Sequence, residues 1–123
     1  MQAVKGKGTS LERQMALLLQ RKGRRPQKNV AHLPGKPDLA FARHKIAVFV
    51  DGDFWHGWRF NQWRDKLGDY WKQKIERNRA RDQRNFQRLR RMGWIVIRIW
   101  EHQLKRDPDR CIERVEEAIR SKK

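Results

Sequence analysis

Cysteine and acidic residues are both scarce in this sequence of 123 residues. The single cysteine, Cys111, excludes an internal disulfide and a zinc site built from several cysteines. Fourteen acidic residues stand against 31 Lys and Arg, which gives a net charge of +17. No apolar run is long enough to cross a bilayer, and the N-terminal segment lacks the apolar core of a signal peptide. These absences favour a soluble protein of the cytoplasm.

The excess of positive charge predicts a polyanionic partner. Six tryptophans and five phenylalanines accompany the charge, and several lie outside any apolar helix or strand pattern. Such rings stack on nucleobases, whereas a basic surface that is merely solvated does not need them. Composition therefore favours nucleic acid as the partner, with a ribosome-bound or simply well-solvated basic protein as the alternative.

Short apolar runs predict the strands of one sheet. The runs Leu39–Phe41 and 46–50 flank a basic turn at 43–45 and predict an antiparallel hairpin. The run 94–100 is the most continuous, so we expect it at the centre of the sheet, and a weaker edge strand is expected near 27–31. Residues 57–67 are expected to form a loop that holds three large rings.

Helical periodicity predicts a helix before the hairpin, a second helix from Asp69 to just before Gly93, and a third after Asp107. Thr9 and Glu12 have the spacing of a capping box, which would start the first helix at Thr9 and leave residues 1–8 as a flexible basic arm. The order of elements predicts an α/β fold with one mixed sheet flanked by helices, in a single domain over residues 1–123.

Acidic side chains gather at one end of the predicted hairpin. Asp38 precedes the first strand and Asp51 follows the second, and antiparallel pairing makes these two positions neighbours. Asp53 and His56 come just after them. Two carboxylates with a histidine favour a site for a hard divalent cation and a general base.

The second helix places a carboxylate on its apolar stripe. Asn78 and Asp82 fall on the same face as Ile75 and Phe86. A buried carboxylate needs a partner, because an unpaired one costs on the order of several kcal/mol. Two readings are open: an internal ion pair with an arginine, or a place for Asp82 in the acidic site.

The order of four motifs resembles the very short patch repair (Vsr) endonucleases over nearly the whole chain. The motifs are LPGKPDL, GDFWH after an apolar strand, KIERNRARD and GWIVIRIWE. This resemblance implies a restriction-endonuclease-like fold of the PD-(D/E)xK type. It also implies a nucleoid-associated bacterial enzyme that uses Mg²⁺, with Mn²⁺ possible, to nick one strand of double-stranded DNA 5′ of the T in a T·G mismatch. Such an enzyme repairs deaminated 5-methylcytosine; we expect a monomer that works beside mismatch-repair proteins.

The resemblance also implies roles for individual residues. It assigns Asp38 and the carbonyl of Val50 to the metal and His56 to the general base. Two further acidic residues would hold metal-bound waters or orient the histidine, and Asp51, where the usual family member has histidine, would add a metal ligand. The expected catalytic set is Glu12, Asp38, Asp51, His56 and Asp82.

The same comparison implies how DNA is bound. Phe54, Trp55 and Trp71 match rings that wedge into the base stack, although Trp71 lies on the apolar stripe and is equally suited to a core position. Basic and polar DNA contacts are expected from Lys5, Lys7, Lys74 and Asn78.

The structural zinc of the family has no matching ligand set here. Its three cysteines and one histidine correspond to Asp53, Trp58, Phe60 and His102, so we predict no zinc. Asp53 and His102 are expected to form a hydrogen bond in its place, with Trp58 and Phe60 packed around them. Two other functions stay open: a homing-like or restriction-associated nuclease acting on matched DNA, and a non-catalytic DNA-structure-binding module.

Overall fold

A four-stranded mixed sheet forms the centre of the protein, whose computed structural model describes residues 2–122 and the side chains of residues 10–122. The strands are β1 (Gln27–Lys28), β2 (Leu39–Phe41), β3 (Ile46–Asp51) and β4 (Ile95–Trp100), in that spatial order. β1–β2 and β2–β3 are antiparallel and β3–β4 is parallel, so the predicted hairpin and the predicted mixed sheet are confirmed. β1 is shorter than expected.

β4 lies at an edge of the sheet and not at its centre, so that prediction was wrong. β3 takes the inner position and is buried along its whole length, whereas only Ile97 and Ile99 are fully buried in β4. β4 pairs with only one of the described strands, and four of its six side chains stay partly exposed. An apolar run alone therefore did not indicate a central strand.

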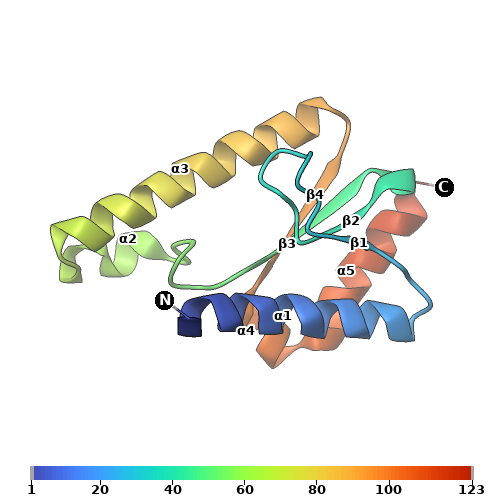
Figure 1. Cartoon of the computed structure of the whole chain (residues 1–123), viewed down its shortest axis with the longest axis horizontal. Helices are drawn as coiled ribbons and strands as arrows, with labels where there is room; N and C mark the ends of the chain where they lie inside the picture. The colour runs from blue at the N-terminus through green and yellow to red at the C-terminus, as the bar shows by residue number, and fades with distance from the viewer. Residues whose placement is uncertain (1, 123) are drawn as a thin grey trace.

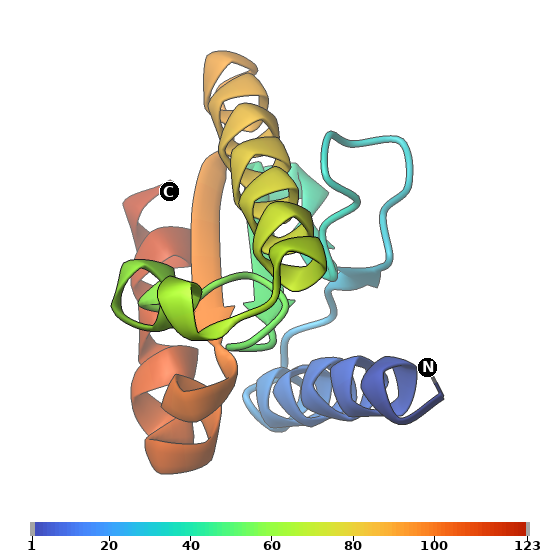
Figure 2. The same cartoon turned by 90° about the vertical axis from the view of Figure 1, so that its left-hand side faces the viewer.

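Helices cover the two faces of the sheet, as Figures 1 and 2 show. On one face, Val48 and Val50 pack with residues of α1 (Gln2–Arg21), α4 (Glu101–Arg106) and α5 (Pro108–Ser121). On the other face, Ala47 and Phe49 pack with residues of α3 (Asp69–Arg91). The alternation follows from the two-residue period of a strand.

The first helix begins at Gln2, so the predicted capping box at Thr9 is wrong and residues 2–8 are helical. Glycine weakens a helix without ending it, and the first proline comes only at Pro26. Leu11, Met15 and Leu19 are buried as expected. The side chains of Lys5 and Lys7 lie outside the described residues, so their predicted DNA contacts stay predictions.

The second and third helices agree with their predicted limits. α3 begins at Asp69 and ends before Gly93, which has a left-handed φ of 86°, although Gly68 and not Asp69 holds the N-cap position. Asp107 caps α5 and accepts a hydrogen bond from the Arg110 N–H at 3.1 Å. The expected loop after β3 contains a short helix, α2 (Phe60–Trp63), and α4 was not predicted.

The N-terminal half of α3 and α2 extend beyond the sheet, at the left of Figure 1. The C-terminal half of α3 is anchored through Phe86, whose ring meets that of Phe49 at 4.9 Å. This arrangement leaves a space at the end of β3 that residues of α1 and α3 line.

Among the described helices, none is long and apolar enough to span a membrane.

Candidate active site

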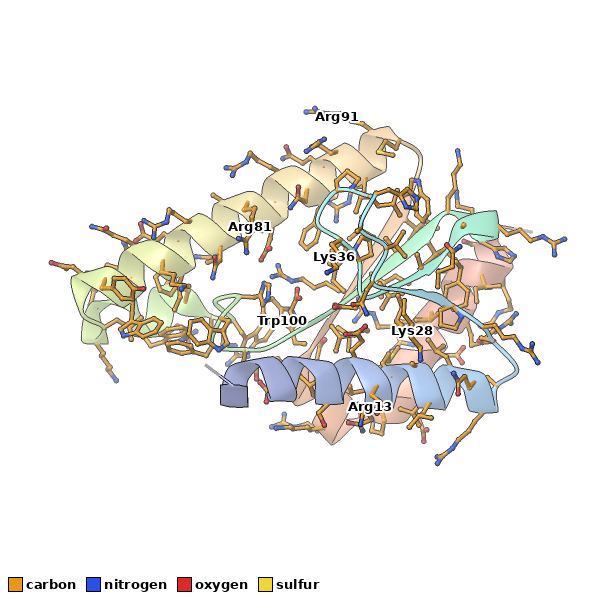
Figure 3. All side chains as sticks on the ribbon, in the orientation of Figure 1. Arg13, Lys28, Lys36, Arg81, Arg91 and Trp100 are labelled. Atoms are coloured by element: carbon orange, nitrogen blue, oxygen red, sulfur yellow. The ribbon has the colours of Figure 1, made fainter. Side chains whose placement is uncertain are left out.

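All five residues predicted as catalytic line one cavity at the end of β3. The cavity has a volume of about 1070 Å³, and its acidic and imidazole lining includes Glu12, Asp38, Asp51, His56 and Asp82. Its rim is basic: Lys36 and Arg81, both labelled in Figure 3, also line it. Residues from α1, the hairpin, the loop after β3 and α3 therefore meet at a single site.

Asp38 is fixed from both sides. Its carbonyl accepts a hydrogen bond from the Asn29 N–H at 2.9 Å, and its carboxylate accepts one from the Val50 N–H at 2.7 Å. Burial and, to a smaller extent, the charges of Asp51 and Glu12 raise the pKa of Asp38 to about 7, against the lowering effect of the Val50 N–H. The predicted proximity of Asp38 and Asp51 is confirmed, and their shared negative charge lacks a sufficient counter-charge.

Glu12 reaches the same cavity from α1. It lies inside that helix and therefore does not cap it. Burial raises the pKa of Glu12, and a hydrogen bond with the Asn29 side chain and the charges of Lys28 and Lys36 act in the opposite direction. Glu12 thus adds a third carboxylate close to Asp38.

Asp51, His56, Asp82 and Arg98 form a closed ring of polar contacts. His56 Nδ1 lies 2.7 Å from Asp82 Oδ2, and His56 Nε2 lies 3.5 Å from Asp51 Oδ1. Arg98 completes the ring: its Nε donates to Asp51 Oδ2 at 2.7 Å and its Nη2 donates to Asp82 Oδ2 at 2.9 Å. Asp82 therefore has both partners that its sequence position left open.

The ring fixes the state of His56. An ionised carboxylate can only accept, so Nδ1 carries the proton toward Asp82 and the lone pair of the neutral ring is on Nε2. Burial lowers the pKa of His56, but the Asp82 hydrogen bond and the charges of Asp51 and Asp82 outweigh it, and the net shift is upward. His56 is a stronger base than a free imidazole.

Close packing brings the His56 loop onto α3. Gly57 has a left-handed φ of 75°, and a Cβ there would lie 2.7 Å from the Arg79 side chain and 3.1 Å from that of Ile75. Asn78 Nδ2 donates to the Trp55 carbonyl at 3.0 Å. Glycine at this position and the asparagine on the helix stripe therefore hold His56 beside Asp82.

The donor set suits a hard divalent cation. One oxygen atom each of Asp51 and Asp82 and a nitrogen of His56 lie within 4.8 Å of one another. Arg98 already neutralises part of that group, whereas Asp38 has no such cationic partner among its described contacts. The carboxylates of Asp38 and Asp51 are therefore candidates to hold a divalent cation.

Sequence reasoning missed Arg98. Arg98 is a single charged residue within an otherwise apolar strand, which indicates an ion pair with a buried carboxylate. Asp82 was already predicted to be such a carboxylate. Glu101 was also not assigned; it lines the cavity and accepts a hydrogen bond from the Asp53 N–H at 3.3 Å.

A cluster of rings lies beside the cavity. Phe54 and Trp71 are 41% and 38% exposed, and both meet Trp55, each at 5.2 Å between ring centroids. Trp63 stacks on Phe54 at 5.5 Å, and Lys74 Nζ lies 5.7 Å from the Trp55 centroid. Trp71 is thus part of a surface cluster and not of the core.

Two of the residues that the resemblance places at a zinc site form a hydrogen-bonded pair instead. His102 Nδ1 lies 2.9 Å from Asp53 Oδ1, as predicted, and the Trp58 ring meets the His102 ring at 4.5 Å. Phe60 is buried and its ring packs on Trp63. Its expected contact with Asp53 and His102 is not among the described ring contacts. One carboxylate and one imidazole, with the rings of Trp58 and Phe60 in place of two cysteines, do not fit a zinc site.

The profile of the DNA mismatch endonuclease Vsr family matches residues 1–62. A type II nicking enzyme of Neisseria meningitidis serogroup C is 40% identical over 99% of this chain and 84% of its own length. A type II nicking enzyme of Haemophilus parainfluenzae is 38% identical over 94% of this chain and 84% of its own. The DNA mismatch endonuclease Vsr of Escherichia coli (strain K12) is 32% identical over 97% of this chain and 80% of its own. With its restriction-endonuclease-like mixed sheet, the chain belongs to the Vsr family of DNA mismatch endonucleases.

Proposed function

We propose that this protein is a divalent-cation-dependent DNA endonuclease that nicks one strand 5′ of the T in a T·G mismatch. The observation that carries the proposal is the convergence of His56, the four carboxylates of Glu12, Asp38, Asp51 and Asp82, and an exposed ring cluster around one cavity with a basic rim. The base and carboxylates provide for hydrolysis, and the rings and positive charge provide for binding a distorted duplex.

His56 would take the proton of the attacking water. Its Nε2 carries the lone pair and is the ring nitrogen away from Asp82, while Asp82 holds the ring and would stabilise the imidazolium that forms. The upward pKa shift strengthens His56 as a base but requires a pH high enough to keep it neutral.

Asp38 and Asp51 would hold the cation, with the Val50 carbonyl as a further ligand and Glu12 beside its waters. When bound, Mg²⁺ supplies the positive charge that stabilises the phosphodiester transition state. The fit rests on charge: the negative charges of Asp51 and Glu12 both raise the pKa of Asp38, which supports an excess of negative charge at this point.

Phe54, Trp55 and Trp71 would wedge into the duplex. Separating base pairs costs stacking energy, and a mismatched pair lowers that cost. The two exposed rings supply the wedge, and Lys74 lies against it where a phosphate would approach. The net charge of +17 adds affinity for DNA without choosing a sequence.

The test is a cleavage assay with Mg²⁺ on labelled duplexes that carry each single mismatch, with matched duplex as the control. We expect a nick confined to the T strand of T·G, and loss of nicking with retained DNA binding in Asp38→Ala. Equal cleavage of matched DNA would replace mismatch repair by a homing-like or restriction-associated activity. Binding without any cleavage would identify a non-catalytic DNA-structure-binding module.

A further inference from the structure

Arg98 is the one charged side chain of β4. Its register partner in the parallel β3–β4 pair is Phe49, and two residues further along the strands Trp100 pairs with Asp51. Residues two apart on a strand share a face, so Arg98 projects toward α3 on the same side as Asp51. The side chain is 17% exposed, so a largely covered guanidinium lies beside the proposed reaction centre.

The guanidinium of Arg98 lies against two aromatic rings. Its central carbon lies 4.2 Å from the centroid of Trp100 and 5.0 Å from that of Phe86. The Arg98 carbonyl accepts a hydrogen bond from Arg114 Nη1 at 3.0 Å. The two rings and the backbone hydrogen bond restrict the side chain, and separate nitrogens of its guanidinium meet Asp51 and Asp82.

Arg98 approaches the two carboxylates from behind the main cavity. It lines a second, smaller cavity of about 450 Å³, together with Arg79, Trp58 and Trp100. His56 lines both cavities and stands between them. Arg98 can therefore orient the carboxylates without competing with DNA or a cation for the face that they turn to the main cavity.

We propose that Arg98 is a positioning residue of the nicking reaction. It holds one oxygen of Asp51 and one of Asp82 at the same time, so that Asp82 keeps His56 in place and the other oxygen of Asp51 stays turned toward the cation and water. This inference rests on the proposed function, because it assigns Arg98 a part in the same chemistry.

The geometry makes a specific demand on the side chain at position 98. Two N–H donors must meet two carboxylates from a fixed plane, which a guanidinium does and an ammonium does not. Lysine keeps the charge but can hold only one carboxylate well. Methionine keeps the bulk between the two rings and removes both the charge and the donors.

The test is single-turnover nicking by the full chain at saturating DNA, with DNA affinity and thermal unfolding measured on the same samples. We expect Arg98→Met to nick about 100-fold more slowly than the wild type, since small misplacement of reacting groups has effects of that size. Its DNA affinity should change by less than about threefold, because the residue lies behind the cavity. Arg98→Lys should recover about tenfold of the loss. Arg120→Met removes an arginine from an exposed pair with Glu113 on α5 and should nick like the wild type.

A rescue experiment separates positioning from folding. Millimolar guanidinium added to Arg98→Ala should restore part of the nicking rate, and urea at the same concentration should not. The proposal is overturned if Arg98→Met nicks within about threefold of the wild type. It is also overturned if the loss follows the folded fraction and guanidinium restores nothing. A wild-type protein that nicks no duplex would instead overturn the proposed function, and this is seen before any variant is made.

Discussion

Two histidine–aspartate pairs lie near each other in this protein and have different surroundings. His56 and Asp82 meet at 2.7 Å, and His102 and Asp53 meet at 2.9 Å. The imidazoles are similarly exposed, at 26% and 29%, but Asp82 is 11% exposed and Asp53 is 33% exposed. The hydrogen bond alone therefore does not distinguish a reactive histidine from a structural one.

The other contacts of each pair make the distinction. Asp82 also binds Arg98, and the second nitrogen of His56 faces Asp51 in a cavity. The ring of His102 is covered by Trp58, and Asp53 accepts from the His102 backbone at 3.5 Å as well as from its ring. His56 therefore lines the main cavity and its partner Asp82 is bound by Arg98. His102 instead packs against Trp58, and its hydrogen bond with Asp53 joins the loop after β3 to α4.

Replacing each histidine by alanine separates the pairs most strongly. We expect His56→Ala to lower the single-turnover nicking rate by about 10³-fold, because a general base contributes 10²–10⁴-fold. His102→Ala should change the rate of the folded protein by less than about threefold. Equal losses in the two variants, measured at saturating DNA, would show that the contrast is wrong.

The aspartates give a smaller effect of the same kind. Asp82→Asn can donate to Nδ1 of His56 instead of accepting from it, and it also deprives Arg98 of a charged partner. We expect nicking to fall by about 10–100-fold, as for other groups that orient a reactive histidine. Asp53→Asn is the matched control and should leave the nicking rate unchanged. A loss of rate in Asp53→Asn equal to that in Asp82→Asn would contradict the assignment of separate roles.

The pair of His102 and Asp53 should contribute to stability. Asp53→Ala removes the hydrogen bond to His102, which stabilises by about 1 kcal/mol and corresponds to about 4 °C in Tm. Because this pair occupies the place of the family's zinc, we expect elemental analysis to find no stoichiometric zinc and a chelator to leave Tm unchanged. One zinc per chain, lost together with Tm on chelation, would refute the prediction.

Local pattern was enough to predict most of the fold and the acidic part of the site. Asp38 and Asp51 could be placed together because an antiparallel hairpin fixes which ends meet. The position of β4 in the sheet could not be predicted. An apolar run indicates that a strand is at least partly buried, but it does not indicate which strands lie on either side of it.

The sequence left the partner of Asp82 open for a related reason. Its position on the apolar stripe of α3 indicated a partner but left two alternatives, an arginine or the acidic site. The structure joins them, because Arg98 and His56 meet the same oxygen of Asp82. Contacts between residues far apart in the chain depend on strand order, and strand order was the part that the pattern left unresolved.

The ion pair between Arg24 and Glu116 contains no histidine and can be compared with the two histidine–aspartate pairs. Arg24 makes two hydrogen bonds to Glu116, both at 2.8 Å, and joins the segment after α1 to α5. The Arg24 hydrogen bonds lower the pKa of Glu116 below its ordinary value of 4.5, against the effect of burial. The stabilisation is therefore complete above that value and is lost as the pH falls through the lower pKa of the folded state.

Arg24→Met should thus lower Tm at pH 7 by only about 2 °C, since a partly exposed pair contributes about 0.5 kcal/mol. The difference from the wild type should shrink as the pH falls through the lowered pKa of Glu116 in the folded state, because the protonated carboxyl no longer pairs with Arg24. Arg110→Met, which breaks an exposed pair with Glu117 on α5, is the control for lost charge. A Tm difference for Arg24→Met that persists unchanged in acid would mean that Arg24 stabilises by packing its aliphatic chain and not through Glu116.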